Sequence, residues 1–331
     1  MRTVGLAGVL LGLAVVGCSD ALEQTTPVGQ EIVVLDGQST SLTLVNAGDF
    51  SVTSLPLLFA VSGAPRIAGR GSVILVPGGG HDSLQILVLG GSGKVVPVGS
   101  PVSAAFQDDT LAWVTDSAFD ALVQVNVRAA QKVVSPAIGT GPVAAAVVDS
   151  QVFSAHKTWL TAIKIAGAST PDSIPLSGTD AHFVVVGDDS LLYVVERGDS
   201  GLANGRMSVV DPGAREELVV INGLGERPGP GVFHPTGRIL IASATEGILE
   251  INSLTRSVIR GPGAGIKPGG HGVVALSLDN RGRVYAVAAG TCGGAPGTLY
   301  VLSPPPDYNV ITTVALGTCP VASTVAEMPP Q

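Results

Sequence analysis

Residues 101–134, PVSAAFQDDTLAWVTDSAFDALVQVNVRAAQKVV, contain four short apolar runs separated by polar turns. The runs are residues 102–106, 111–114, 123–127 and 132–134. Short runs that are rich in valine and partly alternate with polar residues are typical of β-strands. Aspartates between the first two runs favour a tight turn, because their side chains bond to their own backbone. The stretch therefore predicts four consecutive antiparallel strands that form one small sheet.

The same order of runs recurs along the chain at spacings of 36 to 50 residues. Each copy starts with a segment that is rich in small residues or led by proline, and these segments begin at Ala64, Ser100, Gly141, Thr179, Gly229, Gly270 and Cys319. A repeated four-stranded unit of about 40 residues is typical of β-propeller blades. The small residues of each first strand fit this fold, because the innermost strands crowd around the ring axis.

The two ends of the chain predict how the ring closes. After Pro320 there is room for only one more strand, whereas residues 32–35, 42–45 and 50–55 supply three strand-like runs at the other end. One strand and three strands make a complete blade, so we expect the C-terminal strand to complete the N-terminal blade. The sequence thus predicts an all-β, seven-bladed propeller of four-stranded antiparallel blades over residues 31–328.

The composition agrees with this fold and argues against several other classes of protein. The chain of 331 residues has 44 glycines, 23 prolines and only 13% charged residues. Few charges argue against long amphipathic helices, and a hydrophobic content of 45% argues against disorder. The net charge is −8 and the sequence has no basic stripe, so we do not expect nucleic-acid binding.

The first residues carry an export signal. Arg2 precedes an uncharged apolar run from Val4 to Val16, which is short for a membrane span but right for a signal-peptide core. The run ends in Val15-Val16-Gly17-Cys18, which resembles the bacterial lipobox, whose cysteine is lipidated and becomes the mature N-terminus. We therefore predict a signal peptide over residues 1–17 and a lipidated tether over residues 18–30. A cleaved signal without lipid and an uncleaved anchor are the alternatives.

Three segments of the repeat in residues 101–134 follow a recognisable order: Trp113-Val114-Thr115-Asp116, Val123-Gln124-Val125-Asn126 and Lys132-Val133-Val134. Val209-Val210-Asp211-Pro212 is a partial copy further along the chain. This order resembles the repeat of the YVTN-type surface-protein propellers, and the resemblance covers residues 30–328. It implies an extracytoplasmic binding or structural propeller and no reaction.

Two cysteines remain besides Cys18. Cys292 falls in a glycine-rich loop between the second and third predicted strands of the last full blade, and Cys319 falls just before the closing strand. In a propeller these two kinds of loop emerge on the same face, and export permits oxidation. We therefore predict a Cys292–Cys319 disulfide. Two buried free thiols are the alternative, and a metal site would have only His271 as a neighbouring ligand.

The polar residues divide into two sets. The first set lies in turns between first and second strands, where a purely structural role is expected; it comprises Asp108, Asp109, Asp188, Asp189, Asp279 and Asn280. The second set lies in the loops of the opposite face, where ring proteins bind their ligands. We predict as a candidate binding face His81, Asp82, Asp116, Asp120, His156, Arg197, Asp199, Glu246, His182 and His271, with Lys157 and Asp180 beside them. A solvated loop surface is the alternative.

Three functions remain open. The first is a non-catalytic binding or scaffolding propeller tethered to a bacterial membrane, at the outer membrane, the cell surface or a periplasmic face. The second is a propeller hydrolase resembling the metal-dependent lactonases, which would need acidic ligands, for example for calcium, around the axis. The third is an accessory lipoprotein of an envelope assembly. The sequence has no catalytic motif that favours an enzyme, and we expect a monomer without a cofactor that meets the membrane only through its lipid and binds an unidentified protein or small molecule.

Overall fold

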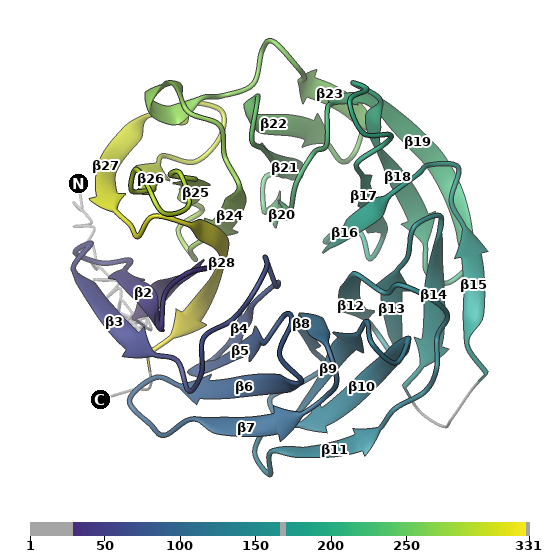
Figure 1. The fold of residues 1–331 in the computed structure, drawn as a ribbon. Helices are drawn as coiled ribbons and strands as arrows, with labels where there is room; N and C mark the ends of the chain where they lie inside the picture. The colour runs from purple at the N-terminus through teal and green to yellow at the C-terminus, as the bar shows by residue number, and fades with distance from the viewer. Residues whose placement is uncertain (1–28, 166–169, 329–331) are drawn as a thin grey trace, which may run out of the picture.

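The computed structural model describes residues 29–165 and 170–328. The predicted signal peptide, Cys18 and most of the predicted tether lie outside the described residues, so these features stay predictions. The described chain forms seven four-stranded antiparallel sheets arranged in a ring, and Figure 1 shows the ring viewed along its axis. The predicted seven-bladed β-propeller is therefore confirmed.

Each blade runs from an innermost strand at the axis to an outermost strand at the rim. In that order the first blade contains β28 (Pro320–Glu327), β1 (Gln30–Asp36), β2 (Ser41–Asn46) and β3 (Val52–Pro56). The second contains β4 (Ala68–Arg70), β5 (Val73–Pro77), β6 (Ser83–Val88) and β7 (Lys94–Pro97). The third contains β8 (Pro101–Phe106), β9 (Leu111–Asp116), β10 (Ala121–Asn126) and β11 (Gln131–Val134).

The remaining four blades follow in chain order. The fourth contains β12 (Ala144–Val148), β13 (Gln151–Ala155), β14 (Trp159–Lys164) and β15 (Asp172–Pro175). The fifth contains β16 (Ala181–Val186), β17 (Leu192–Glu196), β18 (Gly205–Asp211) and β19 (Glu216–Gly225). The sixth contains β20 (Gly231–His234), β21 (Arg238–Ser243), β22 (Gly247–Asn252) and β23 (Ser257–Arg260), and the seventh contains β24 (Ala275–Leu278), β25 (Val284–Ala288), β26 (Thr298–Leu302) and β27 (Val310–Ala315).

Helical structure is almost absent from the part of the chain that the structure describes. It consists of one 3₁₀ turn, η1 (Pro268–Gly270), just before the last full blade. None of the helices found in residues 29–165 and 170–328 is long and apolar enough to cross a membrane.

The ring closes where the two ends of the chain meet. Strand β28 pairs antiparallel with β1 from Gln30 opposite Glu327 to Asp36 opposite Pro320. The backbone N–H of Gly37 donates to the Cys319 carbonyl at 2.8 Å, and the Asp36 carboxylate accepts from the Cys319 N–H at 3.2 Å. The prediction that the C-terminal strand completes the N-terminal blade is confirmed.

The predicted disulfide is also present. Cys292 lies between β25 and β26, Cys319 lies between β27 and β28, and their Cα atoms are 4.5 Å apart. The bond therefore connects the last full blade to the start of the closing strand.

The hydrophobic core lies between neighbouring blades. Phe153 and Leu160 of the fourth blade, for example, pack with Leu192 and Val194 of the fifth, and all four are fully buried. Similar layers separate the other blades, so each blade is stabilised mainly by the blades on either side of it.

Two aspartates of the first-to-second strand turns, Asp108 and Asp279, have the structural role that the sequence predicts, whereas Asp109 is exposed and pairs with Arg70. Asp108 accepts the N–H groups of Thr110 and Leu111 at 2.7 and 2.8 Å. Asp279 accepts those of Arg281 and Arg283, both at 2.9 Å. These bonds fix the turn backbone and leave little of either carboxylate free.

The second and seventh blades begin later than their repeats suggest, and the seventh starts with β24 at Ala275, although its segment begins at Gly270. The segment that starts at Ala64 predicts an innermost strand there, yet β4 begins only at Ala68. The preceding residues instead run beside the third blade, where the Arg66 N–H donates to the Val102 carbonyl at 2.9 Å. Arg66 is therefore fixed by its backbone at the point where the chain reaches the ring axis.

We predict that replacing both disulfide cysteines, Cys292→Ser with Cys319→Ser, destabilises the ring without changing its fold. The bond closes a sequence separation of 27 residues. The loop-closure estimate for such a separation is roughly 3–4 kcal/mol of unfolding free energy. Denaturant unfolding without reductant should show this difference from wild type, and it should disappear when reductant is added. Two free thiols in unreduced, denatured wild type would contradict the prediction.

Candidate functional site: the axial mouth

One face of the ring collects the loops between second and third strands and the connections from blade to blade; we call it the mouth face. The antiparallel order of each blade requires this, because first-strand starts, second-strand ends and third-strand starts lie at the same edge. All ten residues of the predicted binding face fall in these loops or strand ends. Whether they contact a ligand stays a prediction, but their present bonding separates them into groups.

Asp116 is bonded to the protein itself. It is 2% exposed, and one carboxylate oxygen accepts the N–H groups of Ser100, Ala118 and Phe119 at 3.0 to 3.2 Å. A carboxylate that accepts several backbone N–H groups stabilises the loop around it. Asp116 therefore holds the β9–β10 loop and the preceding blade connection together.

His156 is likewise part of the interior. It is fully buried, its ring stacks on Trp159 at 4.9 Å between centroids, and both nitrogens have partners. Nδ1 lies 2.9 Å from the Thr140 carbonyl, and Nε2 lies 3.0 Å from the Thr161 hydroxyl. Burial lowers the pKa of His156, so the ring is neutral at physiological pH.

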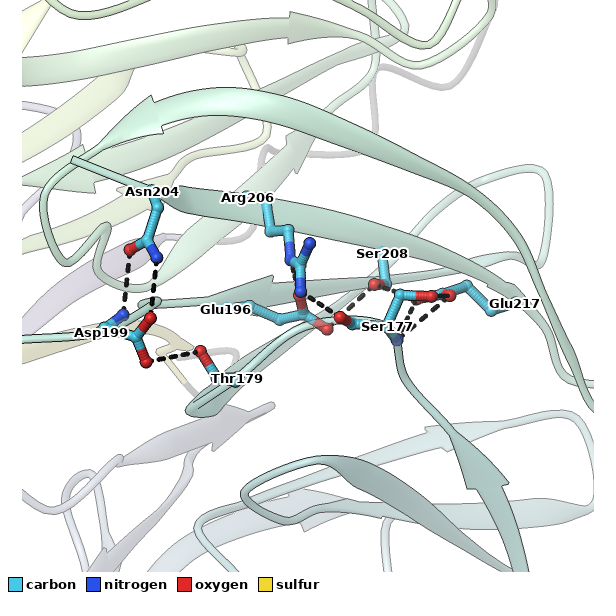
Figure 2. A network of polar contacts seen from close by, with 8 residues as sticks. All are labelled: Ser177, Thr179, Glu196, Asp199, Asn204, Arg206, Ser208 and Glu217. Atoms are coloured by element: carbon cyan, nitrogen blue, oxygen red, sulfur yellow. Dashed lines mark hydrogen bonds and ion pairs between the residues drawn. The ribbon is translucent and has the colours of Figure 1, made fainter. Parts of the chain in front are cut away.

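Three acidic residues of the predicted face are also engaged by neighbouring groups. Asp199 exchanges hydrogen bonds with Asn204 at 2.9 and 3.0 Å, as Figure 2 shows. Asp120 accepts the Gly141 N–H at 2.9 Å, and Glu246 accepts the Gly263 N–H at 3.0 Å. These carboxylates fix the connections between blades.

The exposed members of the predicted face are His81, Asp82, Asp199 and His271. His81 lies beside Phe59, with 5.3 Å between ring centroids, and Asp82 accepts the Ser83 hydroxyl at 3.1 Å. His81 and Asp82 share the β5–β6 loop of the second blade, whereas Asp199 lies in the fifth blade and His271 precedes the seventh, so the four do not form one compact cluster.

A polar network that the sequence did not suggest lies in the fifth blade, close to Asp199 (Figure 2). Glu196 is fully buried and receives hydrogen bonds from Arg206 Nε and the Ser208 hydroxyl, both at 2.9 Å. Burial raises the pKa of Glu196, and the neighbouring Glu217 raises it further. Glu217 in turn contacts Ser177 in the connection between the fourth and fifth blades. The network therefore links these two blades near the rim of the ring.

Arg197 and His182 belong to a second cluster, which we call the axial mouth: Arg66, Asp180, His182, Phe183, Arg197 and Arg227. The Arg66 guanidinium lies over the Phe183 ring at 4.7 Å from its centroid. Arg66 precedes β4 and Phe183 belongs to β16, three blades further around the ring, so this contact crosses the axis; Figure 1 shows β4 and β16 on different sides of the central space.

The axial mouth has more positive charge than its own carboxylate can balance. Arg227 lies 3.6 Å from the Asp180 carboxylate, whereas within residues 29–165 and 170–328 neither Arg66 nor Arg197 forms an ion pair. The Nε atom of Arg197 is buried and has no hydrogen-bond partner there. Buried polar groups are nearly always paired, so an unpaired guanidinium nitrogen is unusual.

The pKa values reflect this crowding of cations. Burial, and then the charges of Arg66, Arg197 and Arg227, lower the pKa of His182 to about 2. Burial and the charge of Arg197 lower the pKa of Arg66 to about 9. At neutral pH His182 is therefore neutral while the arginines remain charged.

A cavity of about 450 Å³ follows the ring axis from the axial mouth toward the opposite face. Arg66 and Phe183 are among its lining residues, and the innermost strands β20, β24 and β28 contribute apolar residues such as Leu276 and Val325. Arg70 lines it as well, and its Nε pairs with Asp109 at 2.7 Å on the face of the first-to-second strand turns. The two arginines near β4 thus differ, because Arg70 has a carboxylate partner and Arg66 has an aromatic one.

Sequence reasoning found Arg197, His182 and Asp180 but missed Arg66 and Arg227. The first residues of the repeats contain a pattern that singles out Arg66. The segment Ala64-Pro65-Arg66-Ile67 has an arginine at its third position, where the other six segments have Val, Ala or Gly. A long cation in a place that otherwise holds small residues indicates a role at the axis.

A metal site of protein ligands has little support among the described residues. None of their side chains gather into a group of three or more His, Cys, Asp or Glu that could hold a metal ion. At the axial mouth itself, three guanidinium groups would repel a cation.

Comparisons with known proteins identify the fold. No protein-family model matches the sequence, and no curated protein matches it either. A functionally unknown protein from Desulfotomaculum acetoxidans has a similar structure, with a TM-score of 0.68, 12% identity and coverage of 90% of this chain and 99% of that one. Hydrazine synthase from Kuenenia stuttgartiensis gives a TM-score of 0.66 and 13% identity, covering 80% of this chain and 90% of that one.

AztD from Citrobacter koseri is also similar, with a TM-score of 0.59 and 14% identity over 92% of this chain and 99% of that one. At these identities the similarity shows a shared propeller fold alone, and the named neighbours differ in function. The YVTN-type resemblance is not supported by a family match.

We predict that Asp116→Ala lowers the unfolding free energy, whereas Asp82→Ala leaves it nearly unchanged. Removing the buried Asp116 carboxylate leaves three backbone N–H groups without their acceptor, at a cost of about 1–3 kcal/mol. Asp82 is exposed, and such substitutions usually change stability by less than about 0.5 kcal/mol. Denaturant unfolding of both variants tests this, and equal effects would contradict the structural role of Asp116.

Proposed function

We propose that the protein is a non-catalytic extracytoplasmic binding or scaffolding propeller, a lipoprotein of the YVTN type that is tethered to a bacterial membrane through Cys18. Its ligand binds at the axial mouth on the mouth face. The observation that carries this proposal is the unbalanced charge of the axial mouth, where three arginines accompany one carboxylate.

The physical reason is the cost of burying charge. A partly buried guanidinium without a partner is destabilising unless something compensates it. Arg206, Arg238 and Arg283 elsewhere in the ring all pair with carboxylates, so the fold is able to supply partners. Among the described residues, Arg66, which lines the axial cavity, and Arg197 near it have no carboxylate in an ion pair, and a partner from outside the chain would supply one.

The two alternatives differ from the proposal in what they require. A metal-dependent hydrolase needs acidic ligands around the axis, and the charge there favours an anion over a metal ion. An envelope assembly is compatible with a scaffolding propeller, and it would be recognised by the identity of the partner.

We predict that wild type carries fatty acid on Cys18 and that Cys18→Ala carries none, with the propeller folded in both proteins. A multiply acylated cysteine holds a protein firmly to a bilayer. Growth of expressing cells with a radiolabelled fatty acid should label the wild type and not the variant. Wild type that takes up no label would contradict the lipid anchor.

We also predict that a double variant, Arg197→Ala with Arg227→Ala, loses an envelope component that wild type retains. Full-length protein would be extracted in mild detergent, and the bound proteins and small molecules would be identified by mass spectrometry. Arg281→Ala is the matched control, because it removes an exposed arginine of the opposite face, in the turn between β24 and β25. Equal recovery by all three proteins, or no recovery by wild type, would contradict binding at the axial mouth. Recovery of outer-membrane assembly proteins would favour the envelope-assembly alternative.

A further inference from the structure

The charge and the cavity together define a class of ligand, and this inference rests on the proposed function. We propose that the axial mouth binds the oxyanion group, a carboxylate or phosphate, of a small molecule whose short apolar body enters the axial cavity. Arg66, Arg197 and Arg227 supply the positive charge, and the innermost strands supply the apolar wall.

The chemistry of the arginines favours an oxyanion over other anions. A guanidinium group presents N–H donors in a planar fork that matches carboxylate and phosphate oxygens. The buried Nε of Arg197 has no hydrogen-bond partner among the described residues, and an oxyanion oxygen would supply one. An anion would also reduce the repulsion between Arg197 and its two neighbouring arginines, which lowers the pKa values of this cluster.

The single carboxylate of the cluster is not placed to neutralise all three cations. Asp180 lies 3.6 Å from Arg227, and its charge also raises the pKa of Arg197, so this one carboxylate faces two of the three cations. His182 is neutral, so it adds no charge but can provide one hydrogen bond to a ligand.

The position of Arg66 connects the charged mouth to the apolar cavity. Its guanidinium stacks on Phe183, a contact that fixes the group while leaving its N–H edge available. Below it the cavity is lined by apolar residues such as Ile67, Val232 and Leu276, which are largely packed between the blades. Its volume of about 450 Å³ lies within the range of small-molecule pockets, roughly 300–1,000 Å³. A ligand with an anionic group at the axial mouth and an apolar body along the axis would match both the arginine cluster and the cavity.

Calorimetric titration of the full-length protein in detergent tests the proposal directly. The probes are hexanoate, acetate, inorganic phosphate and hexylamine, each with a blank titration into detergent alone. We expect saturable binding of hexanoate that is stronger than that of acetate, and none of hexylamine. Stronger binding of phosphate than of hexanoate would identify the bound group as a phosphate. It would also contradict the claim that an apolar body enters the cavity. Absence of binding by every anion to folded wild type would overturn the whole inference.

Variants then locate the site. Arg197→Ala and Arg66→Gln should weaken hexanoate binding by about tenfold or more, because each removes a charge-assisted hydrogen-bond donor. Arg281→Ala should bind like wild type, since Arg281 is exposed in the turn between β24 and β25 and does not line the cavity. Thermal unfolding checks that each variant is folded. Arg227→Ala tests the site even if the other two variants fail to fold. The Arg227 side chain is 42% exposed, so its loss should leave folding intact and still weaken hexanoate binding.

The two proposals fail differently. If no anion binds but the envelope component still depends on Arg197 and Arg227, this inference falls and the proposed function stands. If Arg66→Gln and Arg281→Ala weaken hexanoate binding equally, the anion binds outside the axial mouth and the inference is wrong. If neither an anion nor an envelope component binds, both are wrong.

Discussion

The antiparallel pairing of β28 with β1 is the contact on which the whole ring depends. The core of this protein lies between blades, so a blade that lacks a neighbour exposes an apolar face to water. The pairing of the two chain ends removes that exposed face and fixes the innermost position of the first blade. The Cys292–Cys319 disulfide lies beside the first residues of β28 and adds a covalent connection there.

Closure also determines what the centre of the ring can hold. Seven innermost strands meet around the axis, and most repeat starts have only small residues or proline there. Arg66 is an exception, as are Asp180, His182 and His271, and the Arg66 side chain reaches across to Phe183. Because Arg197, His182 and Arg227 come from the same side of the ring as Phe183, closure brings separate segments into one charged mouth. The candidate site is therefore a consequence of the ring rather than of any local motif.

The sequence predicted the features that depend on local pattern and on counting. Strand order, seven blades, the composite first blade, the turn aspartates and the disulfide all follow from short patterns and from the spacing of repeats. It could not predict which way loop side chains turn. Asp116 and His156 lie on the mouth face, yet their side chains bond to the protein itself. Asp116 accepts from Ser100, and His156 contacts Thr140, and both partners lie in the connection that enters the same blade. The contact of Arg66 with Phe183 was equally hidden, because it joins blades on different sides of the axis.

The central claim is that a small organic anion occupies the axis with its charged end at Arg197. A crystal structure with 6-bromohexanoate, with data collected at the bromine absorption edge, tests this most directly. The account predicts the bromine peak inside the cavity beside Leu276 and the carboxylate within hydrogen-bonding distance of Arg66 and Arg197. A bromine peak only on the outer surface of the ring, or an axial cavity filled by water alone at saturating ligand, would contradict it.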